Sequence, residues 1–157
     1  MDEHPRILVV DDDETIRTVL ATVLEENGYT VDTAENGKKA IEKTNTRFYN
    51  LALCDIRLPD YEGTTLITKM RETVPKMRKI IITGFPSLQN TAEALNKGAD
   101  AYIMKPFDMD KVLQTIKEQL KKQQEEKKYG QEKVTEFIET RVKELEEEKT
   151  ATQKENR

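Results

Sequence analysis

The stretch ILVVDDDETI, residues 7–16, places four apolar residues directly before four acidic ones. A short apolar run bounded by charged residues is typical of a β-strand that is buried on both faces of a sheet. Neighbouring acidic side chains repel one another by roughly 1 kcal/mol in water, and by more near a protein. We therefore expect a cation to bind where this strand ends, beside Asp11, Asp12 and Asp13.

Length and composition favour one domain with an appendage. The chain has 157 residues, a net charge of −4 and a single cysteine, Cys54, which we interpret as a core residue. The acidic balance argues against direct binding to nucleic acid, and one cysteine excludes an internal disulfide and fits a reducing cytosol. No apolar run reaches the roughly 18 residues of a membrane span, and the first residues do not resemble a signal peptide. We predict a soluble, cytoplasmic protein without a membrane partner.

Strand-like and helix-like segments alternate along the first 120 residues. Short apolar or β-rich runs predict strands at 7–10, 29–34, 51–55, 79–84 and 101–104. Apolar residues at helical spacing predict a helix after each strand, and the face of the last one is formed by Val112, Leu113, Ile116 and Leu120. Five strands that alternate with five helices imply right-handed crossovers and a parallel sheet covered on both faces. The predicted fold class is therefore α/β.

The residues that follow each strand are the candidates for chemistry, because ligands of such sheets bind outside the carboxyl ends of the strands. These residues are Asp11, Asp12, Asp55, Thr83 and Lys105. Three carboxylates suit Mg²⁺, which keeps water and phosphate oxygens as its other ligands. An aspartate can accept a phosphoryl group, and a hydroxyl and an ammonium can hold its oxygens. The strand at 29–34 ends without such groups, so we expect it at the edge of the sheet.

Each candidate also has a purely structural interpretation. An acidic residue after a strand commonly caps the next helix, as we expect for Asp13. Taken singly, Thr83 is an ordinary β-branched strand residue and Lys105 an ordinary solvated charge. Their common position at one rim of the sheet is what favours a phosphoryl-transfer site.

Four motifs resemble the receiver domain of two-component response regulators: ILVVDDDE (7–14), LALCDIRLPDYEG (51–63), IIITGF (80–85) and GADAYIMKPFD (98–108). The resemblance covers residues 5–120 and implies a flavodoxin-like sheet of order 2-1-3-4-5. It implies that Asp55 accepts a phosphoryl group from a phosphohistidine of a sensor histidine kinase or phosphotransfer protein. Such a domain is no classical enzyme: it catalyses its own phosphorylation and slow autodephosphorylation, and switches conformation to control a partner or output domain.

The resemblance also assigns roles to single residues. The Mg²⁺ ligands would be Asp11, Asp12, Asp55 and the backbone carbonyl of Arg57. The phosphoryl oxygens would be held by Thr83 and Lys105.

A conformational switch is implied as well, formed by Thr83 and Tyr102. Without the resemblance, Tyr102 reads as a strand aromatic whose hydroxyl lies in solvent. The Lys105-Pro106 peptide is expected to be cis, and Gly63 matches a loop glycine of the family. The variable positions that tune dephosphorylation fall on Arg57 and Phe85.

The acidic stretch has a second interpretation. Asp11-x-Asp13-x-Thr15 also resembles the first motif of haloacid-dehalogenase-type phosphatases, which are Mg²⁺ enzymes in which Asp11 would be the nucleophile. No later acidic pair follows a strand to complete that metal site, and Asp55 would then have no role.

The remaining residues form a charged helical extension, so we divide the chain into a receiver domain at 1–120 and an extension at 121–157. The last helix is expected to run on, and one apolar stripe is formed by Val134, Ile138, Val142 and Leu145. This helix cannot bury its stripe alone. Two interpretations stay open: a dimerising or signalling helix, and a charged linker or tail. A homodimer would use this helix or the face built from the fourth helix, fifth strand and fifth helix.

Overall fold

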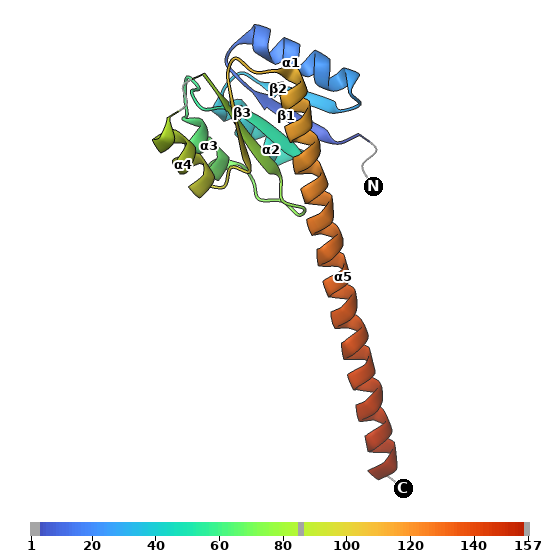
Figure 1. The fold of residues 1–157 in the computed structure, drawn as a ribbon. Coiled ribbons are helices and arrows are strands. Elements are labelled where there is room, and N and C mark those ends of the chain that lie inside the picture. The colour runs from blue at the N-terminus through green and yellow to red at the C-terminus, as the bar shows by residue number, and fades with distance from the viewer. Residues whose placement is uncertain (1–3, 85–86, 156–157) are drawn as a thin grey trace. The chain divides into compact units, whose positions relative to one another are not determined.

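Five strands and five helices alternate in the computed structural model, which describes residues 4–84 and 87–155 (Figure 1). Their bounds are β1 (Arg6–Val10), α1 (Glu14–Glu26), β2 (Thr30–Ala34), α2 (Gly37–Thr46), β3 (Leu51–Asp55), α3 (Gly63–Lys69), β4 (Arg78–Thr83), α4 (Leu88–Asn96), β5 (Ala101–Met104) and α5 (Met109–Glu155). The alternation predicted from the apolar pattern is therefore confirmed. Within the described residues, none of the helices combines the length and apolar character that a membrane span requires.

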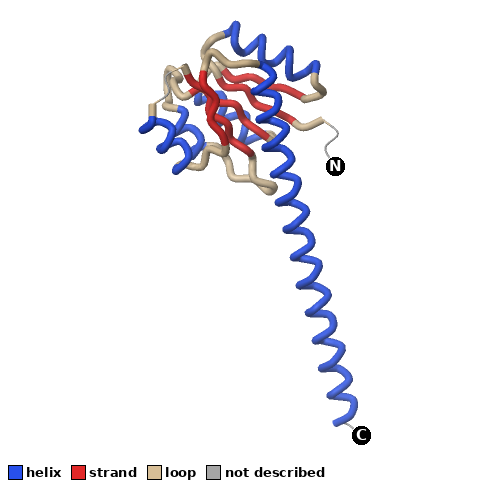
Figure 2. The backbone as a smooth tube through the Cα atoms, in the orientation of Figure 1, coloured by secondary structure: helices blue, strands red, loops and turns tan. Residues whose placement is uncertain are grey.

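The strands form one parallel sheet in the order β2-β1-β3-β4-β5, which Figure 2 shows in red. This is the predicted flavodoxin-like order, and β2 lies at the edge as expected. In the central pair, Val10 of β1 is in register with Cys54 of β3. The residues that follow these two positions, Asp11 and Asp55, therefore leave the sheet side by side.

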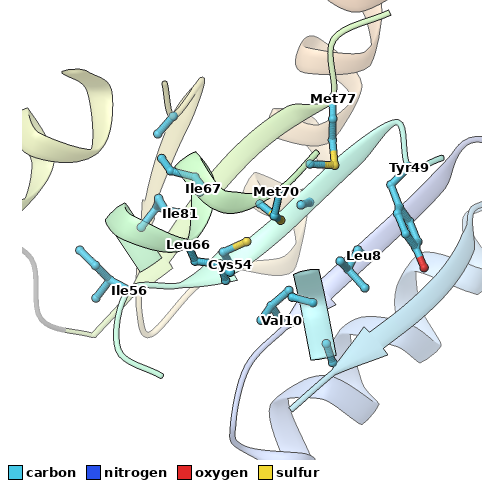
Figure 3. Packing of buried hydrophobic residues seen from close by; sticks show 14 of the residues in the cluster. Leu8, Val10, Tyr49, Cys54, Ile56, Leu66, Ile67, Met70, Met77 and Ile81 are labelled. Carbon is cyan, nitrogen blue, oxygen red and sulfur yellow. The ribbon is translucent and has the colours of Figure 1, made fainter. Parts of the chain in front are cut away.

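Side chains of the buried strands alternate between two cores, one on each face of the sheet. On β1, Leu8 and Val10 join one core while Ile7 and Val9 join the other. The first core is completed by helices α2, α3 and α4 through Ala40, Leu66, Ile67 and Ala94, and by Met70 at the end of α3. Figure 3 shows Leu66, Ile67 and Met70 in this core. The second is completed by helices α1 and α5 through Leu20, Leu24, Val112, Ile116 and Leu120. Each of the larger side chains, Leu, Ile, Val or Met, contributes about 1.5–3 kcal/mol when it is fully buried.

Cys54 is part of the first core, as the sequence predicted. Its side chain is fully buried between the sheet and α3 (Figure 3). Burial raises the pKa of the Cys54 thiol to about 12. The thiol is therefore protonated at neutral pH.

The chain divides into two compact units, Met1–Gln123 and Gln124–Arg157. The first unit includes the start of α5 as far as Gln123, whose side chain is buried. The Gln123 amide donates hydrogen bonds to the carbonyls of Asn50 at 2.9 Å and Lys76 at 2.8 Å. The packed part of α5 thus extends three residues beyond the boundary that we placed after residue 120.

The second unit is helical, and all of its side chains described up to residue 151 are exposed. Large apolar groups among them are Tyr129, Val134, Phe137, Ile138, Val142 and Leu145. The predicted apolar stripe therefore lies on a continuous helix. Gly130 does not interrupt that helix, although glycine costs about 1 kcal/mol relative to alanine in a helix interior.

Candidate phosphoryl-transfer site

Three carboxylates converge at the carboxyl ends of β1 and β3. One oxygen atom from each of Asp11, Asp12 and Asp55 lies within 4.8 Å of the other two. Asp11 and Asp55 are buried, whereas Asp12 is exposed. The cluster therefore has a buried base and one side open to solvent, through which a donor can approach.

Lys105, which follows β5, joins the two buried carboxylates. Its Nζ lies 2.8 Å from Asp11 Oδ2 and 3.2 Å from Asp55 Oδ2. Burial lowers the pKa of Lys105, but its hydrogen bond to Asp11 and the charge of Asp55 outweigh this, so its pKa lies above the ordinary value. Lys105 therefore remains a cation and offsets part of the repulsion between the two acids.

Asp55 has a pKa above its ordinary value. Burial is the main cause, and the negative charge of Asp11 adds to it. The backbone N–H of Arg57, which donates to Asp55 Oδ1 at 3.2 Å, and the charge of Lys105 act in the opposite direction. A cation at the cluster would lower this pKa, because a nearby opposite charge favours the ionised carboxyl.

Local hydrogen bonds hold the acidic turn in place. Asp13 is the N-cap of α1, and its Oδ1 accepts from the backbone N–H groups of Thr15 and Ile16. The capping role predicted for Asp13 is therefore confirmed. Asp11 Oδ1 accepts from the Asp13 N–H at 2.9 Å, and Arg17 donates to the Asp11 carbonyl at 2.8 Å. The Arg17 contact has no local sequence signature, and we did not predict it.

Gly63 allows the loop after Asp55 to return to the strand. Its N–H donates to the Ile56 carbonyl at 2.7 Å. A Cβ atom at this position would lie 2.4 Å from the Asp55 carbonyl oxygen and 2.8 Å from Ile56 Cα. Only glycine fits here, which is the physical reason for the glycine that we singled out in the sequence.

Thr83 and Tyr102 lie on the neighbouring strands β4 and β5. Thr83 is fully buried, and its carbonyl accepts from the Lys105 N–H at 2.7 Å. The Tyr102 ring packs against the core cluster, and its hydroxyl is buried without a hydrogen-bond partner among the described residues. The interpretation that places this hydroxyl in solvent is therefore wrong. The Lys105-Pro106 peptide is cis, as predicted, and Phe85 lies outside the described residues.

The donor set fits a hard divalent cation. Two oxygens on opposite sides of one Mg²⁺, each about 2.1 Å from the ion, lie about 4.2 Å apart. One oxygen atom from each of the three carboxylates lies within 4.8 Å of the other two, which is close to that oxygen–oxygen separation. All three ligand atoms are oxygens, which magnesium prefers to nitrogen and sulfur.

The comparison with protein families agrees with this geometry. The family model of the "Response regulator receiver domain" matches residues 7–117. This chain belongs to the response regulator receiver family. The resemblance seen in the four sequence motifs is therefore confirmed. The model that matches is that of the receiver, which favours this resemblance over the one to haloacid-dehalogenase-type phosphatases.

Relatives of the receiver include regulators and solved domains. The transcriptional regulatory protein ZraR of Klebsiella oxytoca is 38% identical over 118 residues, which are 75% of this chain and 27% of ZraR. A CheY-like receiver domain protein of Methanospirillum hungatei has a TM-score of 0.75 and 46% identity, covering 78% of this chain and 98% of its own. TrrA of Thermotoga maritima, solved in complex with Mg²⁺–BeF, has a TM-score of 0.65 and 33% identity, covering 73% of this chain and 98% of its own.

Proposed function

We propose that this receiver accepts a phosphoryl group on Asp55 from a phosphohistidine of a sensor histidine kinase or phosphotransfer protein, in a Mg²⁺-dependent reaction. The observation that carries the proposal is the cluster of Asp11, Asp12 and Asp55 with Lys105 bound to two of its members. Family membership supports it, because receivers belong to two-component signalling. The complex of TrrA with Mg²⁺–BeF supports the choice of magnesium.

The chemistry follows from the position of Asp55. One carboxylate oxygen of Asp55 attacks the phosphorus atom, the new O–P bond forms, and the P–N bond to the donor imidazole breaks. The imidazole leaves with the electron pair of that bond and takes up a proton. Lys105 Nζ, which is 3.2 Å from Asp55 Oδ2, is placed to donate to a phosphoryl oxygen. Later, water attacks the phosphorus atom slowly, the Asp55 O–P bond breaks, and inorganic phosphate leaves, which returns Asp55 to its carboxylate.

Magnesium would be held by Asp11, Asp12, Asp55 and the backbone carbonyl of Arg57. When bound, it supplies positive charge that offsets the carboxylates and the charge on the transferring oxygens. The Asp13 N–H and Lys105 restrain the carboxylate of Asp11 from two sides, so this ligand is already oriented.

A conformational response would pass through Thr83 and Tyr102. In this proposal the Thr83 hydroxyl turns toward the phosphoryl group and changes the space available to the Tyr102 ring. Ile81, two residues before Thr83, is in register with Tyr102 across β4 and β5. The buried position of the Tyr102 hydroxyl would be one end state of this proposed switch. Phosphorylation would shift the population between this state and one with Tyr102 turned outward.

The partners of the receiver are proposals too. The chain spans 27% of the length of ZraR, so control of an output domain or of a separate protein is consistent with its relatives. Homodimers would form through the α4–β5–α5 face or through the extension of α5. We propose no direct contact between these acidic residues and nucleic acid.

Labelling with acetyl phosphate tests the function directly. The wild-type chain with Mg²⁺ should gain one phosphoryl group, seen by intact-mass spectrometry, and borohydride trapping should locate it at Asp55. Asp55→Asn and removal of Mg²⁺ with EDTA should each abolish the label, whereas the matched control Asp110→Asn, at the start of α5, should keep it. A label trapped at Asp11 would contradict the proposal, as would a label that survives in Asp55→Asn.

A further inference from the structure

The loop between Asp55 and Gly63 is attached by its tip to the start of α2. Asp60 Oδ1 accepts a hydrogen bond from the Gly37 N–H at 2.8 Å, and Asp60 Oδ2 accepts from the Lys38 N–H at 2.9 Å. The first N–H groups of a helix have no partner within the helix, so a carboxylate is well suited to them. We call this pair of hydrogen bonds the Asp60–α2 contact. It joins residues that are 22 and 23 positions apart in the sequence.

Close packing accompanies the Asp60–α2 contact. The Tyr61 ring lies so near the Gly37 backbone that a Cβ atom on Gly37 would be 2.4 Å from Tyr61 Cδ2. The loop tip can therefore reach the helix only because residue 37 has no side chain. Burial raises the pKa of Asp60, but the N–H groups of Lys38 and Gly37, together with those of Asp60 and Tyr61, outweigh it and hold this pKa below its ordinary value.

The helix does not depend on Asp60 alone for its cap. Asn36 is the N-cap residue of α2, and its side-chain oxygen accepts from the Lys39 N–H at 2.8 Å. Asn36 and Asp60 thus satisfy different N–H groups of the same helix end. This pair gives a matched comparison, because only Asp60 connects the helix to the loop that follows the phosphoacceptor.

The base of the same loop is attached to the phosphoacceptor. The Arg57 N–H donates to Asp55 Oδ1 at 3.2 Å, and Arg57 and Glu62 form an antiparallel bridge. Inside the loop, the Leu58 N–H donates to the Tyr61 carbonyl at 3.1 Å. The position of Arg57 is therefore set by Asp55 at one end of the loop and by the α2 helix at the other.

The start of α2 also lies at the carboxyl edge of the sheet, where the acidic turn lies. β2 leads into this helix, and the carbonyl of its last residue, Ala34, accepts from the Asp11 N–H at 3.2 Å. The Asp60–α2 contact therefore links the Asp11 side of the cluster to the Asp55 side.

We propose that Asp60 is a positioning residue for Mg²⁺ binding and phosphorylation, which holds the Arg57–Glu62 loop in place by fixing its tip to the start of α2. The inference rests on the function proposed above. The described hydrogen bonds of the Asp60 side chain go to the start of α2, so Asp60 would act on the site through the loop. Its effect should therefore appear in the affinity for Mg²⁺ and disappear when Mg²⁺ is saturating.

Three variants of the full chain test the inference: Asp60→Ala, Asp60→Asn and the control Asn36→Ala. Titration calorimetry with MgCl₂ should show about tenfold weaker Mg²⁺ binding in Asp60→Ala, the lower end of the range for a group that orients a metal ligand. Asp60→Asn keeps one acceptor oxygen and should lie between Asp60→Ala and the wild type. Asn36→Ala should bind Mg²⁺ like the wild type. At saturating Mg²⁺, labelling by acetyl phosphate should proceed in Asp60→Ala at the wild-type rate.

Hydrogen exchange supplies a readout that does not depend on activity. The Leu58 amide should exchange faster in Asp60→Ala than in the wild type, and Asn36→Ala should not show this change. Unchanged Mg²⁺ affinity in a folded Asp60→Ala, or an equal loss in Asn36→Ala, would show that Asp60 only caps α2. A wild-type chain that takes no label on Asp55 would instead refute the proposed function, so the two failures are distinguishable.

Discussion

The Gly63→Ala substitution should disturb Asp55, the proposed phosphoacceptor, through a single added methyl group. In the structure, that Cβ would lie 2.4 Å from the Asp55 carbonyl oxygen, whereas ordinary contacts begin at 3.4 Å. The two groups must therefore separate by the difference, about 1 Å. Both contacting groups belong to the backbone, so no flexible side chain can rotate away.

This displacement sets the expected size of two effects, a loss of stability and a loss of labelling rate. Overpacking against fixed atoms costs about 1–3 kcal/mol, and we expect the upper half of that range because backbone atoms must move. At about 4 °C per kcal/mol for a domain of this size, the melting temperature should fall by about 8–12 °C. A misplacement of about 1 Å in a reacting group costs about 100-fold in rate. Mg²⁺-dependent labelling of Asp55 should therefore fall by about that factor.

The assay compares Gly63→Ala with the control Gly130→Ala. A Cβ atom on Gly130 meets nothing within 4 Å, and alanine is favoured over glycine in a helix by about 1 kcal/mol. Urea denaturation and acetyl phosphate labelling at saturating Mg²⁺ should show losses in Gly63→Ala and none in Gly130→Ala. A Gly63→Ala variant with wild-type urea midpoint and labelling rate would refute the inference that Gly63 sets the position of Asp55.

Three further changes test other parts of the fold. Burial opposes ionisation of Asp32, but the Tyr49 hydroxyl and two arginines hold its pKa below the ordinary value of 3.8. The ionised Asp32 therefore stabilises the fold above pH 3.8, and this stabilisation is lost as the pH falls through the lower pKa of the folded state. In urea titrations at pH 5 and pH 3, Asp32→Asn should show a smaller loss of stability between the two pH values than the wild type. Gln123→Ala removes two hydrogen bonds, to the carbonyls of Asn50 and Lys76, and should cost about 1–3 kcal/mol in urea denaturation, although the Asn50 carbonyl keeps the Arg78 N–H as a donor; exposed Gln124→Ala should cost nothing. Tyr102→Phe removes a buried hydroxyl that has no described partner, so the free energy of unfolding should stay equal or rise; a fall of more than about 1 kcal/mol would mean that this hydroxyl has a partner.

The sheet could be predicted from sequence because its strands are buried on both faces. Continuous apolar runs such as residues 7–10 and 79–82 have few other interpretations when helical patterns alternate with them. The candidate site followed from the same reasoning, since parallel strands place Asp11, Asp55 and Lys105 at one rim. Local pattern and global topology agreed here, and the prediction needed no knowledge of side-chain positions.

The contacts that sequence reasoning missed are those made by polar groups over a distance. Gln123 is buried because its amide finds two backbone carbonyls, but a glutamine in a charged stretch reads as a surface residue. Asp60 caps a helix that begins 23 residues earlier, and nothing in its neighbours indicates that partner. Tyr102 was ambiguous because a strand aromatic can direct its hydroxyl to solvent or into the core. In each case the deciding partner comes from another element.

The charges at the rim show how Asp55 could be both buried and, as proposed, reactive. Asp11, Asp12 and Asp55 together carry three negative charges when ionised, and Lys105 returns one positive charge, so the cluster is doubly negative. In that state burial and the charge of Asp11 raise the pKa of Asp55, which lowers its fraction of attacking carboxylate. One divalent cation would neutralise the cluster and lower that pKa again. The nucleophilicity of Asp55 would therefore be coupled to metal binding. Lys105→Met should not abolish labelling of Asp55, but labelling should depend more strongly on Mg²⁺ concentration, because the ion must then offset three negative charges alone.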